Sequence, residues 1–193
     1  FSVRVKGANG NILATLKTDG VLIDTQKPVI SNIADGFDQD IDWYGEDSEG
    51  KIILSVVDNS GVNAYEYSVG TIAGDRDIMN WKLGQDSIGV FDLKDLVEGT
   101  TYYANGRVTD RVGDISDIVS SDGFQMDFTA PQAGVVNIAN AFQSDINTMT
   151  FSWSGFIDEH SGMKSYDVII GTTPGNDDIA NRQKTNSLNT VTV

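Results

Sequence analysis

The feature that most constrains the fold of this chain is a segment that occurs twice at a fixed distance. Residues 18–28 read TDGVLIDTQKP and residues 121–131 read SDGFQMDFTAP, so a Thr/Ser-Asp-Gly turn, an Asp and a Pro recur 103 positions later. Three further pairs of segments match at spacings of 101 to 105, namely 4–12 with 107–115, 32–42 with 137–147, and 60–78 with 161–179. A period of about one hundred residues is the size of one small β-sandwich, so we expect an array of such units.

The repeated segment closes each unit, because a new strand pattern follows it both times, PVISNI in one copy and GVVNIA in the other. This phase predicts the C-terminal part of a first β-sandwich repeat at 1–27, a complete repeat at 28–130 and the N-terminal part of a third at 131–193. We therefore expect the sequence to be a window on a longer tandem array.

Within the complete unit, short runs rich in β-branched and aromatic residues are separated by the turn sequences DNSG, AGDR, VEGT and RVGD. The runs AYEYSV and GVFDL alternate apolar and polar residues, as half-buried strands do. These patterns predict strands at 51–57, 63–70, 88–93, 101–110 and 123–127. No convincing helical periodicity extends over 11 or more residues, so we expect an all-β fold.

The repeated segment itself is interpreted as a joint between units. Its Asp-Gly turn leads into the last strand of a unit, which is expected to end at Asp24 in one copy and Asp127 in the other. The following proline cannot donate to a sheet ladder and fixes its own φ, so it ends pairing and stiffens the linker. We expect only three or four residues between the last strand of one unit and the first strand of the next.

Two motifs resemble known domains. LVEGTTY at 96–102 resembles the tyrosine corner of fibronectin type III domains, Leu-x-Pro-x-Thr-x-Tyr, with Glu98 in place of the proline. FSW at 151–153 resembles the second-strand Trp of the same family, and in the complete unit Val56 takes the place of Trp153. The SDG-to-Pro segment is similar to the inter-repeat junction of large extracellular bacterial surface proteins. The resemblance implies tandem Ig-like or fibronectin type III-like β-sandwiches of the adhesin type.

Net charge and composition exclude several classes of binding partner and of functional site. The chain carries 28 acidic and 13 basic residues, a net charge of −15, which disfavours nucleic acid and anionic lipid. It has no cysteine, which excludes thiol catalysis, thiolate metal sites and disulfides, and its single His160 excludes a His-rich zinc site. No apolar run approaches the roughly 20 residues that span a bilayer.

The acidic segment at 35–50 suggests a calcium site. From Asp38 onward, carboxylates fall at positions 1, 3, 5, 9 and 12 of a twelve-residue loop, as in EF-hand loops; these residues are Asp38, Asp40, Asp42, Glu46 and Glu49. Position 6, which requires Gly in an EF-hand, is Trp43, and the flanks read as strands. A solvated acidic loop is the alternative interpretation.

The junction carboxylates form a second candidate calcium site. Asp24 and Asp127 precede the linker prolines, while Asp19 and Asp122 lie in the turn before the last strand of each unit. Oxygen ligands of this kind suit calcium held between neighbouring units. The alternative is that Asp122 caps a turn and Asp127 ends a strand in solvent.

Other candidate residues point to binding rather than catalysis. Asp158-Glu159-His160-Ser161 brings triad residue types together, but neighbours in one turn cannot converge as a triad does. Trp81 and the Trp43-Tyr44 pair could stack on sugar rings, although packing at a core or sheet edge is the usual role of aromatics. We expect the Trp43-Tyr44 pair, placed in an acidic loop, to have little to pack against.

The sequence thus predicts no catalytic residues. We expect a non-catalytic structural or adhesive segment of a large secreted or cell-surface protein, acting as a stalk or filament spacer. Its expected partners are neighbouring repeats, other copies or surface glycans, with calcium as the one candidate ion. The alternative is a carbohydrate- or calcium-binding accessory module of a secreted multidomain enzyme.

Overall fold

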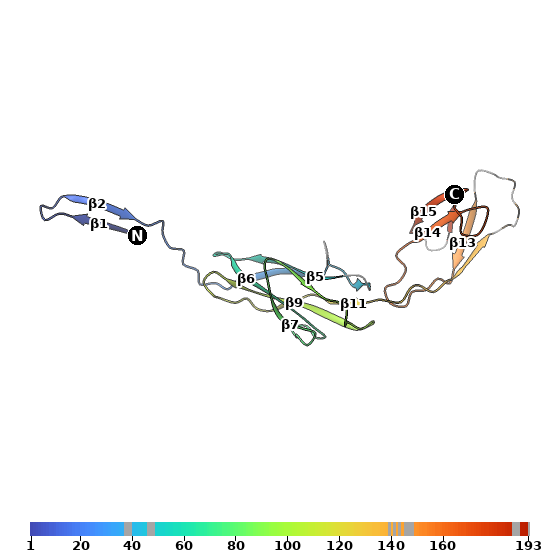
Figure 1. Cartoon of the computed structure of the whole chain (residues 1–193), viewed down its shortest axis with the longest axis horizontal. Coiled ribbons are helices and arrows are strands. Elements are labelled where there is room, and N and C mark those ends of the chain that lie inside the picture. The colour runs from blue at the N-terminus through green and yellow to red at the C-terminus, as the bar shows by residue number, and fades with distance from the viewer. Residues whose placement is uncertain are drawn as a thin grey trace. The chain divides into compact units, whose positions relative to one another are not determined.

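The fold is seen in a computed structural model of the chain, which describes residues 1–36, 40–45, 49–138, 140, 142, 144, 149–186 and 190–192. All the regular elements in these ranges are strands, sixteen in number (Figure 1). The all-β prediction is therefore confirmed. Two compact units are distinguished: unit 1 comprises Phe1–Ile41, Glu49–Asp92 and Tyr102–Phe124, and unit 2 comprises Asp42–Ser48, Leu93–Thr101 and Gln125–Val193.

Unit 1 begins with an antiparallel hairpin of β1 (Ser2–Lys6) and β2 (Ile12–Lys17). Its first larger sheet has the order β3-β5-β8, with β5 antiparallel to both neighbours; the strands are β3 (Val29–Ala34), β5 (Gly50–Val57) and β8 (Ile88–Phe91). A second sheet contains β11-β9-β6-β7 in this order, and β10 also pairs with β9; the strands are β6 (Val62–Gly70), β7 (Met79–Gly84), β9 (Thr101–Asp110), β10 (Val119–Ser120) and β11 (Phe124–Met126). All of these residues belong to unit 1 except Thr101 of β9 and residues 125–126 of β11. These positions confirm the five predicted strands to within two residues.

The two larger sheets of unit 1 pack face to face as a β-sandwich. Phe91 on β8 lies against Phe124 on β11, with ring centroids 5.4 Å apart. Alternation along the strands supplies the core; the buried apolar side chains from the two sheets include Ile52, Leu54, Tyr67, Val69, Phe91, Ala104, Val108 and Phe124. The sandwich architecture predicted for the complete repeat is thereby present in unit 1.

Tyr67 shows how closely the sheets of unit 1 approach one another. Its ring covers Gly89 on the facing sheet so tightly that a Cβ at Gly89 would lie 2.6 Å from Tyr67 Cγ. Gly84, beside it on the neighbouring strand, is also too close to the ring to accept a Cβ. The Tyr67 hydroxyl donates to the carbonyl of Asp86 at 2.6 Å, so the ring is held at both ends.

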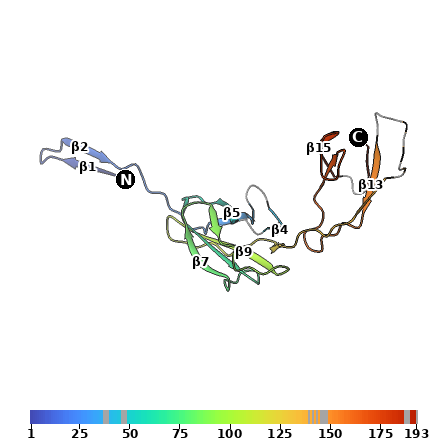
Figure 2. The same ribbon diagram turned by 45° about the vertical axis from the view of Figure 1, so that its right-hand side comes forward.

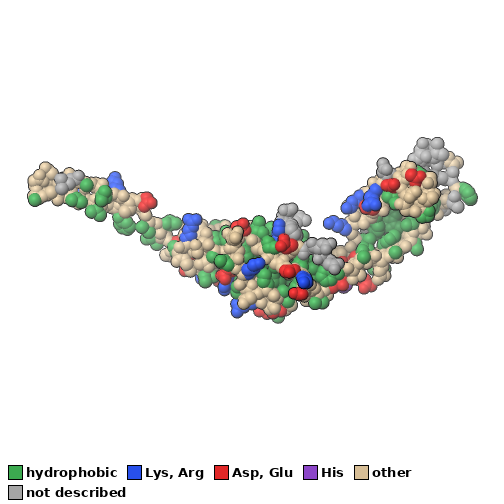
Figure 3. All heavy atoms as spheres, viewed as in Figure 1, with side chains coloured by type: hydrophobic (Ala, Val, Ile, Leu, Met, Phe, Trp, Pro, Cys, Tyr) green, Lys and Arg blue, Asp and Glu red, His purple; other side chains and the backbone are tan. Residues whose placement is uncertain are grey.

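Unit 2 contains β4 (Trp43–Tyr44), which pairs in parallel with the end of β11. It also contains a sheet of order β12-β13-β16 and a hairpin of β14 and β15; their bounds are β12 (Val135–Ile138), β13 (Thr150–Ser154), β14 (Tyr166–Ile170), β15 (Ala180–Thr185) and β16 (Thr190–Thr192). Trp153 is buried against Tyr166 at 5.1 Å between ring centroids. Exposed apolar side chains nevertheless remain on β12, and Figure 3 shows hydrophobic side chains gathered on this part of the chain.

Local geometry recurs at the sequence spacings of the repeat. Gly20 and Gly123, the glycines of the two Asp-Gly turns, have φ of 106° and 107°, a conformation that L side chains rarely adopt. The amide of Gly7 donates to Asn11 O at 2.8 Å, and 103 residues later Asp110 donates to Asp114 O at 3.0 Å. The same backbone turn is therefore built at equivalent places.

Strand register also matches. Val56 pairs with Ile30 where β5 meets β3, and Trp153 pairs with Val136 where β13 meets β12. Counted from the pairs Asn32–Ser55 and Asn137–Ser152, Val56 and Trp153 both occupy the next ladder position, although the register shifts between Ile30 and Asn32 in the first sheet only.

Three expectations about local structure are wrong. Residues 20–24 form no strand, although the corresponding segment near 124–126 does, because β11 has β4 and β9 to pair with and residues 20–24 have no such neighbour among the described residues. The connections between strands are longer than predicted: 18–28 separates β2 from β3, and 127–134 separates β11 from β12. Trp43 and Tyr44 form a short strand and not a loop.

The close approach at Tyr67 gives a stability prediction. Gly89→Ala should lower the free energy of unfolding by about 1–3 kcal/mol, because the added methyl group must displace a buried ring held by a hydrogen bond. Gly45→Ala is the matched control, since nothing lies within 4 Å of a Cβ built there. Urea unfolding of both variants measures the difference; equal stabilities would show that the Tyr67 ring is free to move aside.

Candidate functional sites

The described residues contain two groups of three carboxylates close enough to share a cation. One comprises Asp24, Asp58 and Asp110, and the other Asp35, Asp40 and Asp122; within each group, one carboxylate oxygen per residue lies within 4.8 Å of the others. Both groups belong to unit 1. We call them the Asp24 cluster and the Asp35 cluster.

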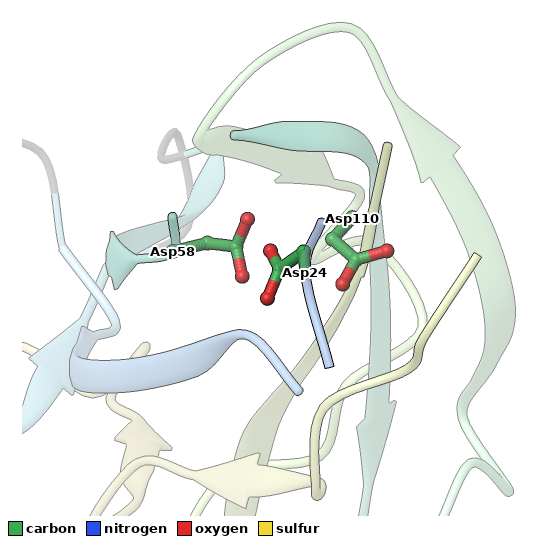
Figure 4. Close-up of side chains that lie close together, drawn as sticks. All are labelled: Asp24, Asp58 and Asp110. Atoms are coloured by element: carbon green, nitrogen blue, oxygen red, sulfur yellow. The ribbon is translucent and has the colours of Figure 1, made fainter. Parts of the chain in front are cut away.

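The Asp24 cluster brings together three parts of the chain (Figure 4). Asp24 lies between β2 and β3, Asp58 directly follows β5, and Asp110 is the last residue of β9. In Figure 4 the Asp24 carboxylate stands between those of Asp58 and Asp110. The sandwich places the latter two, because β6 follows Asp58 after a short turn and pairs with β9 along its length.

Asp110 is the buried member of the Asp24 cluster, with 1 % of its surface exposed. Its Oδ1 accepts the backbone amides of the following turn, from Val112, Gly113 and Asp114 at 2.7–2.9 Å. Its Oδ2 is buried and has no hydrogen-bond partner. One oxygen therefore closes the turn, and the second is a buried acceptor that no donor within the described residues meets.

Asp58 and Asp24 meet at the turn after β5. Asp58 Oδ1 accepts from Ser60 N and Oγ and from Gly61 N at 2.7–2.8 Å. Asp24 Oδ2 accepts from the same Ser60 amide at 3.1 Å, while its Oδ1 accepts from Gln26 N. The pKa of Asp24 is lowered, first by the hydrogen bond from the Gln26 backbone and also by those from Ser60. Asp24 is thus an ionised side chain tied to the turn of the sandwich.

The Asp35 cluster differs from the Asp24 cluster in that the pKa of one member is raised. Asp35 is fully buried, and burial raises its pKa to about 6, with Asp40 and Asp122 adding to the rise and a hydrogen bond from Ser121 opposing it. Asp40 Oδ1 also accepts from the Asp35 amide at 3.2 Å. A proton or a cation would relieve the repulsion in this group.

The predicted calcium loop is only partly within the described residues, since Asp38 and Glu46 lie outside them. Of its other members, Asp40 joins the Asp35 cluster, while Asp42 and Glu49 are exposed and belong to neither group of three. The twelve-residue calcium loop stays a prediction. Sequence reasoning missed Asp58 and Asp110 as members of a carboxylate group; both begin turn sequences, DNSG and DRVGD, which was the available signal.

Asp127, the second junction carboxylate, repeats the contacts of Asp24. Its Oδ2 accepts from the Ser161 amide at 3.0 Å, and Asp158 Oδ1 accepts from His160 N and Gly162 N in the same turn. Hydrogen bonds from Ser161, first from its side chain and then from its backbone, lower the pKa of Asp127 to about 2. The interpretation of Asp127 as a strand end in plain solvent is therefore incomplete. Asp19, the remaining junction residue, belongs to neither cluster.

The aromatic candidate residues differ in how deeply they are buried. Tyr44 is 2 % exposed, so the expectation that the Trp43-Tyr44 pair has little to pack against is wrong for Tyr44; pairing of β4 with β11 directs its side chain inward. Trp43 is half-buried and lies 6.4 Å from the ring of His160. Trp81 lies on β7, the last strand in the order of its sheet, and packs under the guanidinium of Arg107 at 4.5 Å.

His160 has a carboxylate neighbour from outside its own turn. Its Nε2 lies 3.8 Å from Glu98 Oε1, and the same Glu98 oxygen accepts the amides of Phe128 and Thr129 at 3.0 Å. The Ser161 amide is bonded to Asp127. These contacts organise the segment after β11.

Comparison with known proteins gives no matching family model and no matching curated relative. Among the described residues, no helix has the length and apolar character needed to cross a membrane.

The raised pKa of Asp35 predicts an unusual pH dependence. Folding favours the protonated form of Asp35, so the contribution of this group to stability is full below pH 3.8 and declines by up to about 3 kcal/mol as the pH rises through about 6, with one pKa unit worth about 1.4 kcal/mol. Asp35→Asn should remove this decline. Urea unfolding between pH 4 and 7 in the presence of EDTA measures it.

A second variant separates the causes of this pH dependence. Asp40→Asn removes a neighbouring charge and should move the decline to lower pH, because Asp40 contributes to the raised pKa of Asp35. Parallel pH profiles for wild type and Asp35→Asn would contradict the assignment.

Proposed function

We propose that the chain is a non-catalytic spacer: a stretch of tandem β-sandwich repeats, of the Ig-like or fibronectin type III-like kind, within a large secreted or cell-surface protein. The repeats would act as a stalk or filament that holds other parts of the protein at a distance. Its partners would be neighbouring repeats and, in an adhesive role, other copies or surface glycans.

The observation that carries the proposal is the recurrence of one joint. In both copies, an Asp just before the linker proline accepts the backbone amide of a serine in a turn of the repeat that follows. Asp24 accepts from Ser60 at 3.1 Å, and Asp127 accepts from Ser161 at 3.0 Å. An Asp at the start of that turn, Asp58 or Asp158, accepts the glycine amide that follows. A joint built twice in the same way supports serial connection of equivalent units.

A second recurring device lies within the repeats. The side chain of Asp77 accepts both the amide and the hydroxyl of Thr71, at 2.9 and 2.8 Å. The side chain of Asp178 does the same for Thr172, at 3.0 and 2.7 Å. These pairs lie 101 residues apart and close the same kind of strand connection, which supports the proposed boundaries at 28–130 and 131–193.

The acidic character of the chain suits this role. A net charge of −15 keeps neighbouring copies apart, which matters where strand edges are exposed. The arrangement of Asp158, His160 and Ser161 does not favour catalysis, because these residues are engaged in structural contacts: Asp158 accepts the His160 amide, the Ser161 amide donates to Asp127, and the His160 ring lies beside Glu98.

The alternative function, a carbohydrate-binding accessory module, rests on Trp43. This side chain lines a shallow hollow with Gly45, Asp127 and Met163 and is half-buried there. A glycan titration of wild type and Trp43→Ala distinguishes the two: a flat titration supports the spacer, whereas saturable binding lost in the variant supports the module.

The spacer proposal predicts the size and place of the native polypeptide. Intact mass measurement of the protein from its producing cells should give several times 20.8 kDa, since further repeats are expected in series. Antibodies raised against the 193-residue chain should label intact cells or the medium.

Two outcomes would contradict the proposal. A native mass near 20.8 kDa would leave no array, and labelling that requires permeabilised cells would place the chain inside. A cytosolic marker protein, followed in the same cells, controls for lysis.

A further inference from the structure

We propose that the Asp24 cluster is a calcium site, in which one Ca²⁺ is held by the carboxylates of Asp24, Asp58 and Asp110. This inference does not depend on the proposed function, because it follows from the geometry of unit 1. It concerns residues other than those of the predicted loop from Asp38 to Glu49.

The spacing of the three carboxylates fits a single ion. Calcium binds oxygen at about 2.3–2.6 Å, so two ligands of one ion lie at most about 5 Å apart. One oxygen from each of Asp24, Asp58 and Asp110 lies within 4.8 Å of the others. Backbone carbonyls and water would complete the six to eight oxygen ligands that calcium takes.

A second observation points to a ligand independently of this spacing. Asp110 is 1 % exposed, and its Oδ2 is buried without a hydrogen-bond partner. An unpartnered buried carboxylate oxygen is costly unless a cation or a donor meets it. Asp110 supplies one of the three carboxylate oxygens that lie close together, and Figure 4 shows its carboxylate beside that of Asp24, so this buried side chain is part of the cluster.

Protein cations do not neutralise this group. The ion pairs among the described residues join Lys27 to Asp117, Arg107 to Glu66, His160 to Glu98 and Arg182 to Asp167, and none includes a member of the Asp24 cluster. The Arg111 side chain passes Gly61 in the turn that Asp58 begins, where its Nε would lie 3.6 Å from an added Cβ. It makes no ion pair with the three carboxylates.

The ligand chemistry selects calcium among common cations. Three carboxylates without His or Cys favour a hard divalent ion. The carboxylates project from two turns and an irregular segment, and calcium accepts such irregular geometry, whereas Mg²⁺ demands a near-ideal octahedron at shorter distances.

Calcium binding would tie the segment between β2 and β3 to the sandwich. Asp24 is the cluster's only member in that segment, while Asp58 and Asp110 come from the sandwich strands. Binding therefore has a local consequence: the amides of Gln26 and Ser60, which donate to Asp24, become harder to open.

The test uses the whole 193-residue chain after treatment with EDTA. Isothermal titration with CaCl₂ should show saturable binding, and calcium should raise the melting temperature. Asp24→Asn, Asp58→Asn and Asp110→Asn should each weaken binding at least tenfold. At Asp58 and Asp110, Asn keeps the one oxygen that accepts the turn amides but removes the charge. At Asp24, whose two oxygens accept from Gln26 N and Ser60 N, Asn removes the charge and one of these bonds, so the melting temperature without calcium is compared with that of the wild type.

Matched variants make the outcome decisive. Asp77→Asn changes the charge equally at an exposed carboxylate outside both clusters and should leave binding intact. Asp40→Asn disturbs the Asp35 cluster and should also leave it intact. If Asp110→Asn fails to fold, Asp24→Asn still decides, because Asp24 lies outside the sandwich strands.

Three results would overturn the assignment. A flat calcium titration would remove the site, and a melting shift lost in Asp40→Asn but kept in Asp24→Asn would place the ion in the Asp35 cluster. An equal shift with MgCl₂ at the same concentration would reject calcium as the preferred ion. Slower hydrogen exchange at Gln26 and Ser60 on adding calcium would support the assignment.

Discussion

The structure of unit 1 depends on Asp side chains that accept backbone amides where strands end. A turn leaves amides without ladder partners, and these must be bonded when they are partly buried. Asp58 and Asp110 each use one oxygen to accept two or three such donors. These bonds determine where β5 gives way to β6 and where β9 ends, so they set the frame on which the sandwich core packs.

Sequence periodicity predicted most of the strands because alternation and turn residues act locally. The β9 prediction at 101–110 matches the structure at both ends, since the turn sequences VEGT and RVGD bound the run on either side. The same reasoning failed for residues 20–24, which read GVLID where the segment containing β11 reads GFQMD and so share its Gly and Asp positions. A strand also requires hydrogen-bonded neighbours, and no local pattern reports that these are present. Tyr44 was misplaced for a related reason: its burial follows from parallel pairing with β11, some eighty residues away.

The carboxylate clusters were harder to predict than the strands. Asp24 was recognised as a junction residue because its segment recurs, but Asp58 and Asp110 looked like ordinary turn residues in DNSG and DRVGD. Strand register brings these residues together. The β6–β9 ladder begins with Val62 opposite Asp110, so the turn before β6 lies next to the turn after β9. A sequence gives turn positions, whereas the meeting of two turns depends on strand pairing over about fifty residues.

Turn formation and cation binding need not compete for the same side chains. A carboxylate has two oxygens, and in Asp110 the first accepts three amides while the second stays buried and unpartnered. The turn itself needs only the one acceptor oxygen that Oδ1 supplies, so the second, buried oxygen has no part in closing it. The use of Asp at a site with 1 % exposure therefore imposes an electrostatic cost that turn formation alone does not require. A bound cation would offset that cost, and the same charge would then link the segment before β3 to the sandwich.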